Sequence, residues 1–358
     1  MRITVIKINL ILALVLSAWC VEAHVNPKIN KIKRELTQNS SASFREDCVP
    51  ATEQIDMAIN NVRARLTTGG DVWWNLDDGR YVVPKVPIGS GLDEVSAIFA
   101  GAVWLGGFDP SGNLKMAAAT YRNNESNDFY PGPIDPVTGT TDLQTCENWD
   151  RFFRVTGEEI DEHLRKFEIA NQAGEPYDQD SIPDGVKYWP GKGNPYFLEK
   201  FQFELPNTEQ ALGSFWDADL DNLYDPANGD YPIIEIRGCP LPQYPDEMTF
   251  WIYNDAGGTH TATQGQKIQM EVQVQAFAYT TNDAINDMTF QRYKLINRAQ
   301  VDIGDCYFAM WVDPDLGCFT DDYVGCDTTR SMAYVYNEDE FDGENGCVCQ
   351  QGVATYCD

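Results

Sequence analysis

The segment Ile268-Gln-Met-Glu-Val-Gln-Val-Gln-Ala276 has the most regular pattern in the chain. Every second residue is apolar, and the residues between them are glutamine or glutamate. Side chains alternate between two faces along a β-strand, so this spacing predicts a strand with one buried face and one face in water. Such strands are typical of antiparallel sheets.

Neighbouring segments extend this β pattern in both directions. Glycine, proline, aspartate and asparagine cluster between short apolar or alternating runs, as is typical of strands and turns. We therefore expect a mainly β (α+β) fold, an antiparallel β-sandwich of jelly-roll-like form with two or three short helices. The predicted strands lie at 72–74, 81–83, 97–105, 114–121, 288–296 and 307–312.

Two segments carry helical signals. Within residues 53–68, apolar residues recur at helical spacing between a candidate N-cap, Thr52, and the stop signal Gly69-Gly70. A second helix is predicted after Thr156, which is spaced to form a capping box with Glu159. His163 lies beside the apolar stripe of this second helix, and we interpret it as a surface or packing residue.

The N-terminal residues resemble an export signal. Arg2 and Lys7 make a basic start, an apolar run ends near Leu16, and Val21-Glu-Ala23 fits a cleavage site. The apolar run is too short to span a membrane. We therefore predict a signal peptide at 1–23, a flexible linker at 24–50, and a β-rich extracellular region at 51–358. That region either remains whole or divides within the Pro/Gly/Asp-rich stretch 171–198.

The overall charge excludes some partners. The chain has 55 acidic and 26 basic residues and a net charge of −29. Such a charge repels nucleic acid and anionic membrane surfaces, and it suits either solubility outside the cell or the binding of divalent cations. A hydrophobic content of 43% excludes a disordered acidic chain.

The cysteines indicate an oxidising compartment. Ten cysteines are present, of which Cys20 lies in the predicted signal peptide, and export favours disulfide bonds among the rest. Cys347-Val-Cys349 lacks the spacing of a zinc or redox motif, and the chain has only three histidines. The odd number left after signal removal, with Cys357 next to the last residue, predicts a chain truncated at its C-terminus.

The segment from Asp217 to Asp230 has the spacing of a calcium loop. In an EF-hand, positions 1, 3, 5 and 9 contribute oxygen ligands and position 7 contributes its carbonyl. Asn222 and Asn228 replace the usual glycine and final acid, so Asp230 would provide the last ligand. We expect a structural Ca²⁺ site outside an EF-hand, with a solvated turn as the alternative. The predicted ligands are Asp217, Asp219, Asp221, Asp225, Asp230 and the backbone carbonyl of Leu223.

A second acidic segment follows the predicted strand at 307–312. The carboxylates of Asp313, Asp315, Asp321 and Asp322 are spaced to share a hard cation. Cys318 and Cys326 are placed to close this loop as a disulfide. A solvated acidic loop is the alternative interpretation.

Catalytic signals are weaker. Paired carboxylates are the machinery of glycoside hydrolases, but the sequence does not single out one pair among so many acids. We interpret Asp255 and His260 as a turn-stabilising pair, with a general base and its orienting acid as the alternative. Tryptophans suit either the core of a sandwich or the stacking of sugars. The tryptophan candidates for sugar contact are Trp73, Trp74, Trp104, Trp189 and Trp251.

Several segments together resemble an uncharacterised N-terminal region of large secreted Bacteroidota proteins that usually carry a C-terminal type IX secretion sorting domain. The resemblance implies export and display at the cell surface or release, and it identifies no catalytic residues. The sorting domain itself is absent from this sequence. The resembling segments are 61–65, 69–74, 102–107, 128–133, 217–232, 251–255, 311–317 and 322–327.

These observations predict a secreted or cell-surface, calcium-stabilised β-rich protein with a structural, adhesive or glycan-binding role. Its expected partner is a cell-surface glycan or another extracellular protein, and a non-enzymatic role is favoured. The alternative is an extracellular, glycoside hydrolase-like enzyme that uses paired carboxylates.

Overall fold

The structure is a computed structural model that describes residues 47–337 except 88, 92, 93, 124, 211, 242 and 320. The described residues belong to one compact unit, and the stretch 171–198 lies within it. The predicted signal peptide, residues 24–46 of the predicted linker, and the last three cysteines lie outside the described residues. In the described part, no helix is long and apolar enough to cross a membrane.

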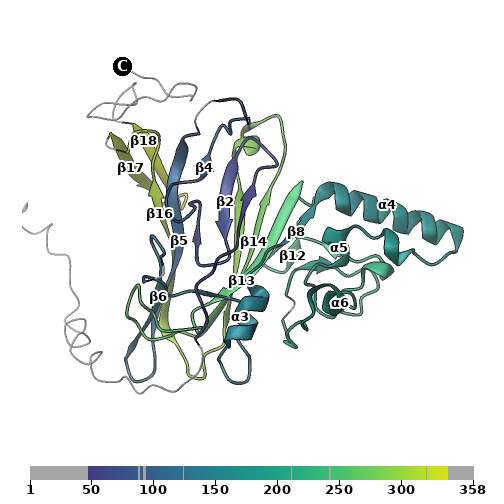
Figure 1. Ribbon diagram of the computed structural model, residues 1–358, viewed down its shortest axis with the longest axis horizontal. Coiled ribbons are helices and arrows are strands. Elements are labelled where there is room, and N and C mark those ends of the chain that lie inside the picture. Colours follow the sequence, from purple (N-terminus) through teal and green to yellow (C-terminus); the bar gives the residue numbers. More distant parts are fainter. Residues whose placement is uncertain are drawn as a thin grey trace, which may run out of the picture. The chain divides into compact units, whose positions relative to one another are not determined.

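The larger of the two main sheets has seven strands in the described part of the chain, and all of its pairs are antiparallel. Its centre is β5 (Ser96–Phe108), which pairs with β16 (Gly304–Pro314) along one edge. Three short strands pair with the other edge of β5, and β2 and β1 follow beyond them (Figure 1). The remaining strands are β1 (Gln54–Met57), β2 (Arg63–Thr67), β3 (Asp71–Val72), β4 (Tyr81–Val82) and β6 (Leu114–Ala118).

The second sheet has five strands in the described residues and is also antiparallel. Its order is β15–β14–β13, and both β7 and β8 pair with the remaining edge of β13. The strands are β7 (Tyr130–Pro131), β8 (Phe153–Thr156), β13 (Glu247–Asn254), β14 (Met270–Ala278) and β15 (Phe290–Asn297).

The two sheets share an apolar core. Leu66 and Val103 of the larger sheet and Trp251, Val272 and Val274 of the second sheet belong to one buried cluster. Burial of such side chains is the main favourable contribution to folding. The mainly β fold with an antiparallel sandwich is therefore confirmed.

Helices and loops cover the opposite face of the second sheet. Phe250 and Met248 of β13 pack there in a second buried cluster with Trp189 and Phe197. In Figure 1, α4, α5 and α6 lie together beside β8. We call this covering part, residues 142–241, the lobe. Its helices are α3 (Leu143–Trp149), α4 (Gly157–Ala173), α5 (Asp184–Lys187) and α6 (Phe197–Phe201), so the described part has four α-helices where two or three were predicted.

The prediction of a wet face on the segment 268–276 is wrong. The apolar alternation is confirmed, but every residue of β14 is buried. Glu271, Gln273 and Gln275 are each at most 1% exposed because the lobe and the segment after β15 cover them. The alternation in the sequence therefore predicted correctly which residues share the polar face of β14, but it did not predict that this face is buried.

The helix predicted at 53–68 is also wrong, because this segment forms the antiparallel pair β1 and β2. Val62, Ala64 and Leu66 are buried on one side, which is the period of a strand. The turn is held by Asn60, whose side-chain amide donates to the carbonyl oxygens of Tyr279 (3.2 Å) and Met288 (2.8 Å). These partners are more than 200 residues away in the chain, so the local spacing of apolar residues gave no sign of their contacts.

The second predicted helix is confirmed as α4. Thr156 and Glu159 form the predicted reciprocal capping box, and Gly174 ends the helix with a φ of 70°. His163 is fully buried and its Nδ1 lies 3.2 Å from the hydroxyl of Tyr177, which confirms a packing role.

A disulfide bond in the described part of the chain supports the expectation of disulfides. Cys48 and Cys146 are bonded and join the start of the described chain to α3. Such a cross-link over 98 residues limits the freedom of the unfolded chain. Among the described cysteines, Cys239, Cys306 and Cys326 are free and exposed.

Candidate functional site

The predicted calcium loop is closed at its base by a short pair of strands. β9 (Phe215–Trp216) pairs with β10 (Tyr231–Pro232), so the residues on either side of the loop 217–230 lie opposite each other. Within the loop, the buried Tyr224 donates its hydroxyl to the carbonyl of Val186 at 2.5 Å. This contact anchors the loop to α5 within the lobe.

Three of the predicted ligands converge. One carboxylate oxygen each from Asp217, Asp219 and Asp230 lies within 4.8 Å of the other two. Burial raises the pKa of Asp230 to about 6, the charges of Asp217 and Asp219 contribute in the same direction, and N–H groups of Ala218 and Asp225 oppose the shift. Three acids so close favour a hard divalent cation, which prefers oxygen ligands.

The other predicted ligands of this loop serve local turns. Asp221 accepts from the N–H of Leu223 at 2.7 Å, and Asp225 accepts from the N–H of Ala227 at 2.9 Å. Neither carboxylate belongs to the converging group among the described residues. Asn222 has a φ of 65°, the left-handed conformation that a turn at this position requires. Calcium binding by these residues stays a prediction.

The second acidic segment is arranged differently. Asp313 is the last residue but one of β16 and accepts a hydrogen bond from the hydroxyl of Tyr121. Asp322 accepts from the N–H of Leu316 at 2.8 Å. Asp315 and Asp321 lie between β16 and β17 (Asp322–Asp327), and within the described ranges no three of these carboxylates converge as in the first loop.

The predicted disulfide between Cys318 and Cys326 is wrong. Cys318 is disulfide-bonded, but Cys326 is free. Cys326 lies in β17, which forms an exposed hairpin with β18 (Met332–Asn337). The extended strand carries Cys326 away from the loop that precedes it, an outcome that sequence separation could not indicate.

An aromatic hollow of about 640 Å³ opens beside Asp313. Its rings pack edge to face: Tyr121 lies 5.8 Å from Trp74 and 5.9 Å from Phe99 between centroids. Tyr121 is 44% exposed and Phe319 is 71% exposed, so aromatic surface faces the solvent. The lining residues besides these four rings are Asp77, Asp313, Pro314 and Asp315.

A buried ion pair positions the floor of the hollow. The indole N–H of Trp74 donates to Asp71 at 2.7 Å, and the guanidinium of Arg122 donates to the other oxygen of Asp71 at 2.7 Å. Asp71 and Arg122 are at most 3% exposed. The ion pair therefore orients Trp74 through its hydrogen bond to Asp71, and it orients Tyr121 because Arg122 is the next residue in the chain.

The aromatic surface continues away from the hollow. Trp311 packs edge to face against Tyr121 at 5.3 Å and stacks on Trp104 at 6.3 Å with an interplanar angle of 5°. Trp104 is 39% exposed. Of the tryptophans predicted for sugar contact, Trp104 is exposed at this surface, and Trp74 lines the hollow but is only 4% exposed. Trp73 packs against the first core, and Trp189 and Trp251 are buried in the two cores.

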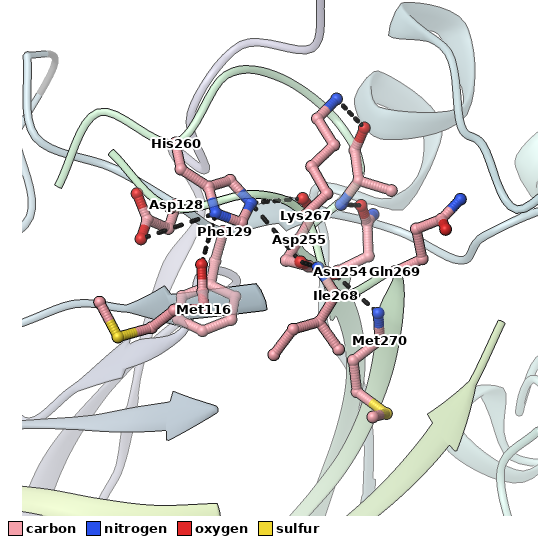
Figure 2. Close-up of polar contacts among 12 residues, drawn as sticks. Met116, Asp128, Phe129, Asn254, Asp255, His260, Lys267, Ile268, Gln269 and Met270 are labelled. Carbon is pink, nitrogen blue, oxygen red and sulfur yellow. Dashed lines mark hydrogen bonds and ion pairs between the residues drawn. The ribbon is translucent and has the colours of Figure 1, made fainter. Parts of the chain in front are cut away.

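His260 and Asp255 form a buried clasp (Figure 2). The ring nitrogens of His260 lie 2.7 Å from the carbonyl oxygens of Met116 and Asp255. Both ring nitrogens are thus occupied by backbone carbonyls, and the His260 side chain is fully buried. The carboxylates of Asp128 and Asp255 lie 3.9 Å and 3.5 Å from the ring nitrogens. The turn-stabilising interpretation fits this geometry, and the general base does not.

Sequence reasoning missed most of the hollow. Phe99, Tyr121 and Phe319 meet there because β5 pairs with β6 and with β16. The sequence indicated Trp74 as a sugar-contact candidate and Asp313 and Asp315 as acids of one segment, but not that they share a hollow. Comparison with protein-family models, with curated proteins and with solved structures gives no match to this chain.

Proposed function

We propose that this chain is a secreted or cell-surface protein that binds glycans through the aromatic hollow, and that Ca²⁺ in the loop 217–230 stabilises its lobe. The observation that carries the proposal is the hollow itself, in which exposed rings and carboxylates adjoin. The predicted signal peptide and the resemblance to exported proteins support the location. Adhesion to a surface or to another extracellular protein would follow from the same contact.

The size and chemistry of the hollow suit a sugar. Ligand pockets measure about 300–1,000 Å³ and combine apolar walls with a few polar groups. Rings such as Tyr121 and Phe319 can stack on the C–H face of a pyranose, while Asp313 can accept hydrogen bonds from its hydroxyl groups. Asp77 adds a second acceptor at the rim.

A binding experiment tests the glycan proposal. A glycan-array screen identifies the ligand, and calorimetry then measures its affinity. We expect Tyr121→Ala to weaken this affinity about tenfold or more, because it removes the ring that contacts Trp74 and Phe99. Tyr307→Ala is the matched control, since Tyr307 is 74% exposed on the same strand as Asp313 and does not line the hollow. Equal effects of the two substitutions would contradict the proposal.

A melting experiment tests the calcium proposal. A ligand at 100 times its Kd stabilises a fold by about 2.7 kcal/mol, which raises Tm by several degrees. We expect EGTA to remove this gain from the parent and Asp219→Asn to abolish it, because Asp219 is an exposed member of the converging group. Asp180→Asn, at a fully exposed acid elsewhere in the lobe, should leave the calcium response intact.

A second candidate function is glycoside hydrolysis. Asp77, Asp313 and Asp315 share one aromatic-walled hollow, and glycosidases use two carboxylates across the scissile bond. Burial raises the pKa of Tyr121 to about 12, and its hydrogen bond to Asp313 adds to this, so the hydroxyl remains a donor. Release of reducing sugar that is lost in Asp313→Asn would favour the enzyme over a binding protein.

A further inference from the structure

The charge in the hollow is one-sided. Asp77, Asp313 and Asp315 contribute carboxylates to its lining, and none of the described lining residues is basic. Asp77 is exposed at a turn, whereas Asp313 is half-buried and held by the hydroxyl of Tyr121. A ligand in the hollow therefore meets negative charge at more than one point of the wall.

The aromatic walls, like the carboxylates, favour a positively charged ligand. The face of an aromatic ring carries negative electrostatic potential and attracts a cation placed over it. Tyr121 and Phe319 offer such surface to the solvent beside Asp313. Rings and carboxylates together favour a ligand that has both a C–H face and a positive charge, and they disfavour an anionic one.

On this basis we infer that the hollow recognises a glycan with free amino groups, a polymer of amino sugars that is cationic when its amines are protonated. This inference rests on the proposed glycan-binding function and specifies its substrate class. The sugar face stacks on Tyr121 or Phe319, and the ammonium group lies against Asp313 or Asp77. An N-acetylated sugar has the same ring but no charge, so it separates the two contributions.

The test compares two oligosaccharides of equal length with the full chain by calorimetry: a glucosamine oligomer and its N-acetylated counterpart. At a pH where the amines are protonated, we expect the glucosamine oligomer to bind at least tenfold more tightly, which corresponds to about 1.4 kcal/mol. Added salt and deprotonation of the amines should each reduce this preference.

Variants assign the preference to the hollow. The double variant Asp77→Asn with Asp313→Asn should abolish the preference for the glucosamine oligomer, because it removes both carboxylate charges. The control is Glu168→Gln with Asp180→Asn, which removes the same charge from exposed positions in the lobe. If the double variant fails to fold, Asp77→Asn alone, at an exposed turn, should reduce the preference for the glucosamine oligomer.

The outcomes separate the inference from the proposed function. Equal binding of the two oligosaccharides would overturn the inference and leave glycan binding intact, whereas no binding of either would overturn both. Equal losses in the double variant and its control would overturn the inference, because the preference would then follow from the net charge of −29. Equally tight binding of oligolysine through Asp77 and Asp313 would overturn it in favour of a basic peptide.

Discussion

The two faces of β14 are equally buried but chemically opposite. Met270, Val272 and Val274 face the larger sheet in an apolar core. Glu271 and Gln275 face the other way and are at most 1% exposed. The difference shows that a polar strand face can lie inside a protein when most of its polar groups have partners; among its described atoms, only Oε1 of Gln273 has no hydrogen-bond partner.

The partners of the polar face come from distant segments. Glu271 accepts from the guanidinium of Arg298 at 3.3 Å and from the N–H of Ile134 at 3.0 Å. Gln275 donates to the carbonyl of Ile233 at 3.0 Å and accepts from Arg292 at 3.0 Å. The apolar face needs only shape and volume, whereas the polar face needs specific atoms at specific positions.

The largest expected effect comes from Glu271→Ala. Removal of this carboxylate leaves Arg298 buried without its counter-charge, which typically costs about 3–5 kcal/mol. Val272→Ala, one residue away on the apolar face, removes two methyl groups and should cost about 2 kcal/mol. Urea unfolding measures both. A smaller loss for Glu271→Ala than for Val272→Ala would mean that the polar face does not depend on this pair.

A pair replacement sharpens the same point. Glu271→Leu combined with Arg298→Met removes both charges together, and such replacements are often close to neutral. We expect the double variant to recover most of the stability lost in Glu271→Ala. Failure to recover it would show that the other groups left without partners carry the effect instead, namely the N–H of Ile134 and the side chains of Gln273 and Gln210.

A smaller effect is expected from His163, on the lobe side of the second sheet. Burial lowers the pKa of His163 to about 4, although the backbone of Gly229 and Asp230 opposes this shift. The unfolded chain therefore binds the proton more readily, and the stability present above pH 6.5 is lost as the pH falls toward 4. The loss amounts to about 3 kcal/mol at most.

The measurement is urea unfolding of the parent and His163→Asn across this pH range. Asp230 titrates in the same window with the opposite sign, because its raised pKa makes protonation favour the fold as the pH falls. The difference between parent and variant removes that shared contribution. A constant difference between pH 4 and 6.5 would contradict the assignment to His163.

The smallest expected effect is that of Gln275→Ala. Its loss leaves the carbonyl of Ile233 without the amide donor, at a cost of about 1–2 kcal/mol. Gln275→Glu is the sharper variant, since it keeps the acceptor for Arg292 and lacks the donor to Ile233. If the two variants unfold at the same urea concentration, the contact with Ile233 dominates. If only Gln275→Ala is destabilised, the contact with Arg292 does.

Local patterns predicted part of the fold. The capping box at Thr156 and the alternation of β14 depend on neighbours within a few residues, so the sequence contains all of their determinants. The segment 53–68 failed because Asn60 is held by Tyr279 and Met288, and tertiary contacts override helical spacing.

Of the two candidate sites, one was predictable from local sequence and the other depends on tertiary contacts. The converging acids Asp217, Asp219 and Asp230 lie within one loop, and their spacing indicated them. The hollow joins Trp74, Tyr121 and Asp313, which the chain separates by up to 239 residues and which come together through the pairing of β5 with β3, β6 and β16. No local pattern encodes that pairing.

The sequence by itself therefore determined the secondary structure of segments such as β14 and α4, the strongly acidic charge and the position of the acidic loop. Tertiary structure decided that the polar face of β14 is buried, that His260 is clasped between two carboxylates, and that separate aromatic residues line one hollow. The physical reason is range. Periodicity and turn chemistry act between near neighbours, whereas burial, ion pairing and cavity formation depend on which distant strands and loops come to lie against each other.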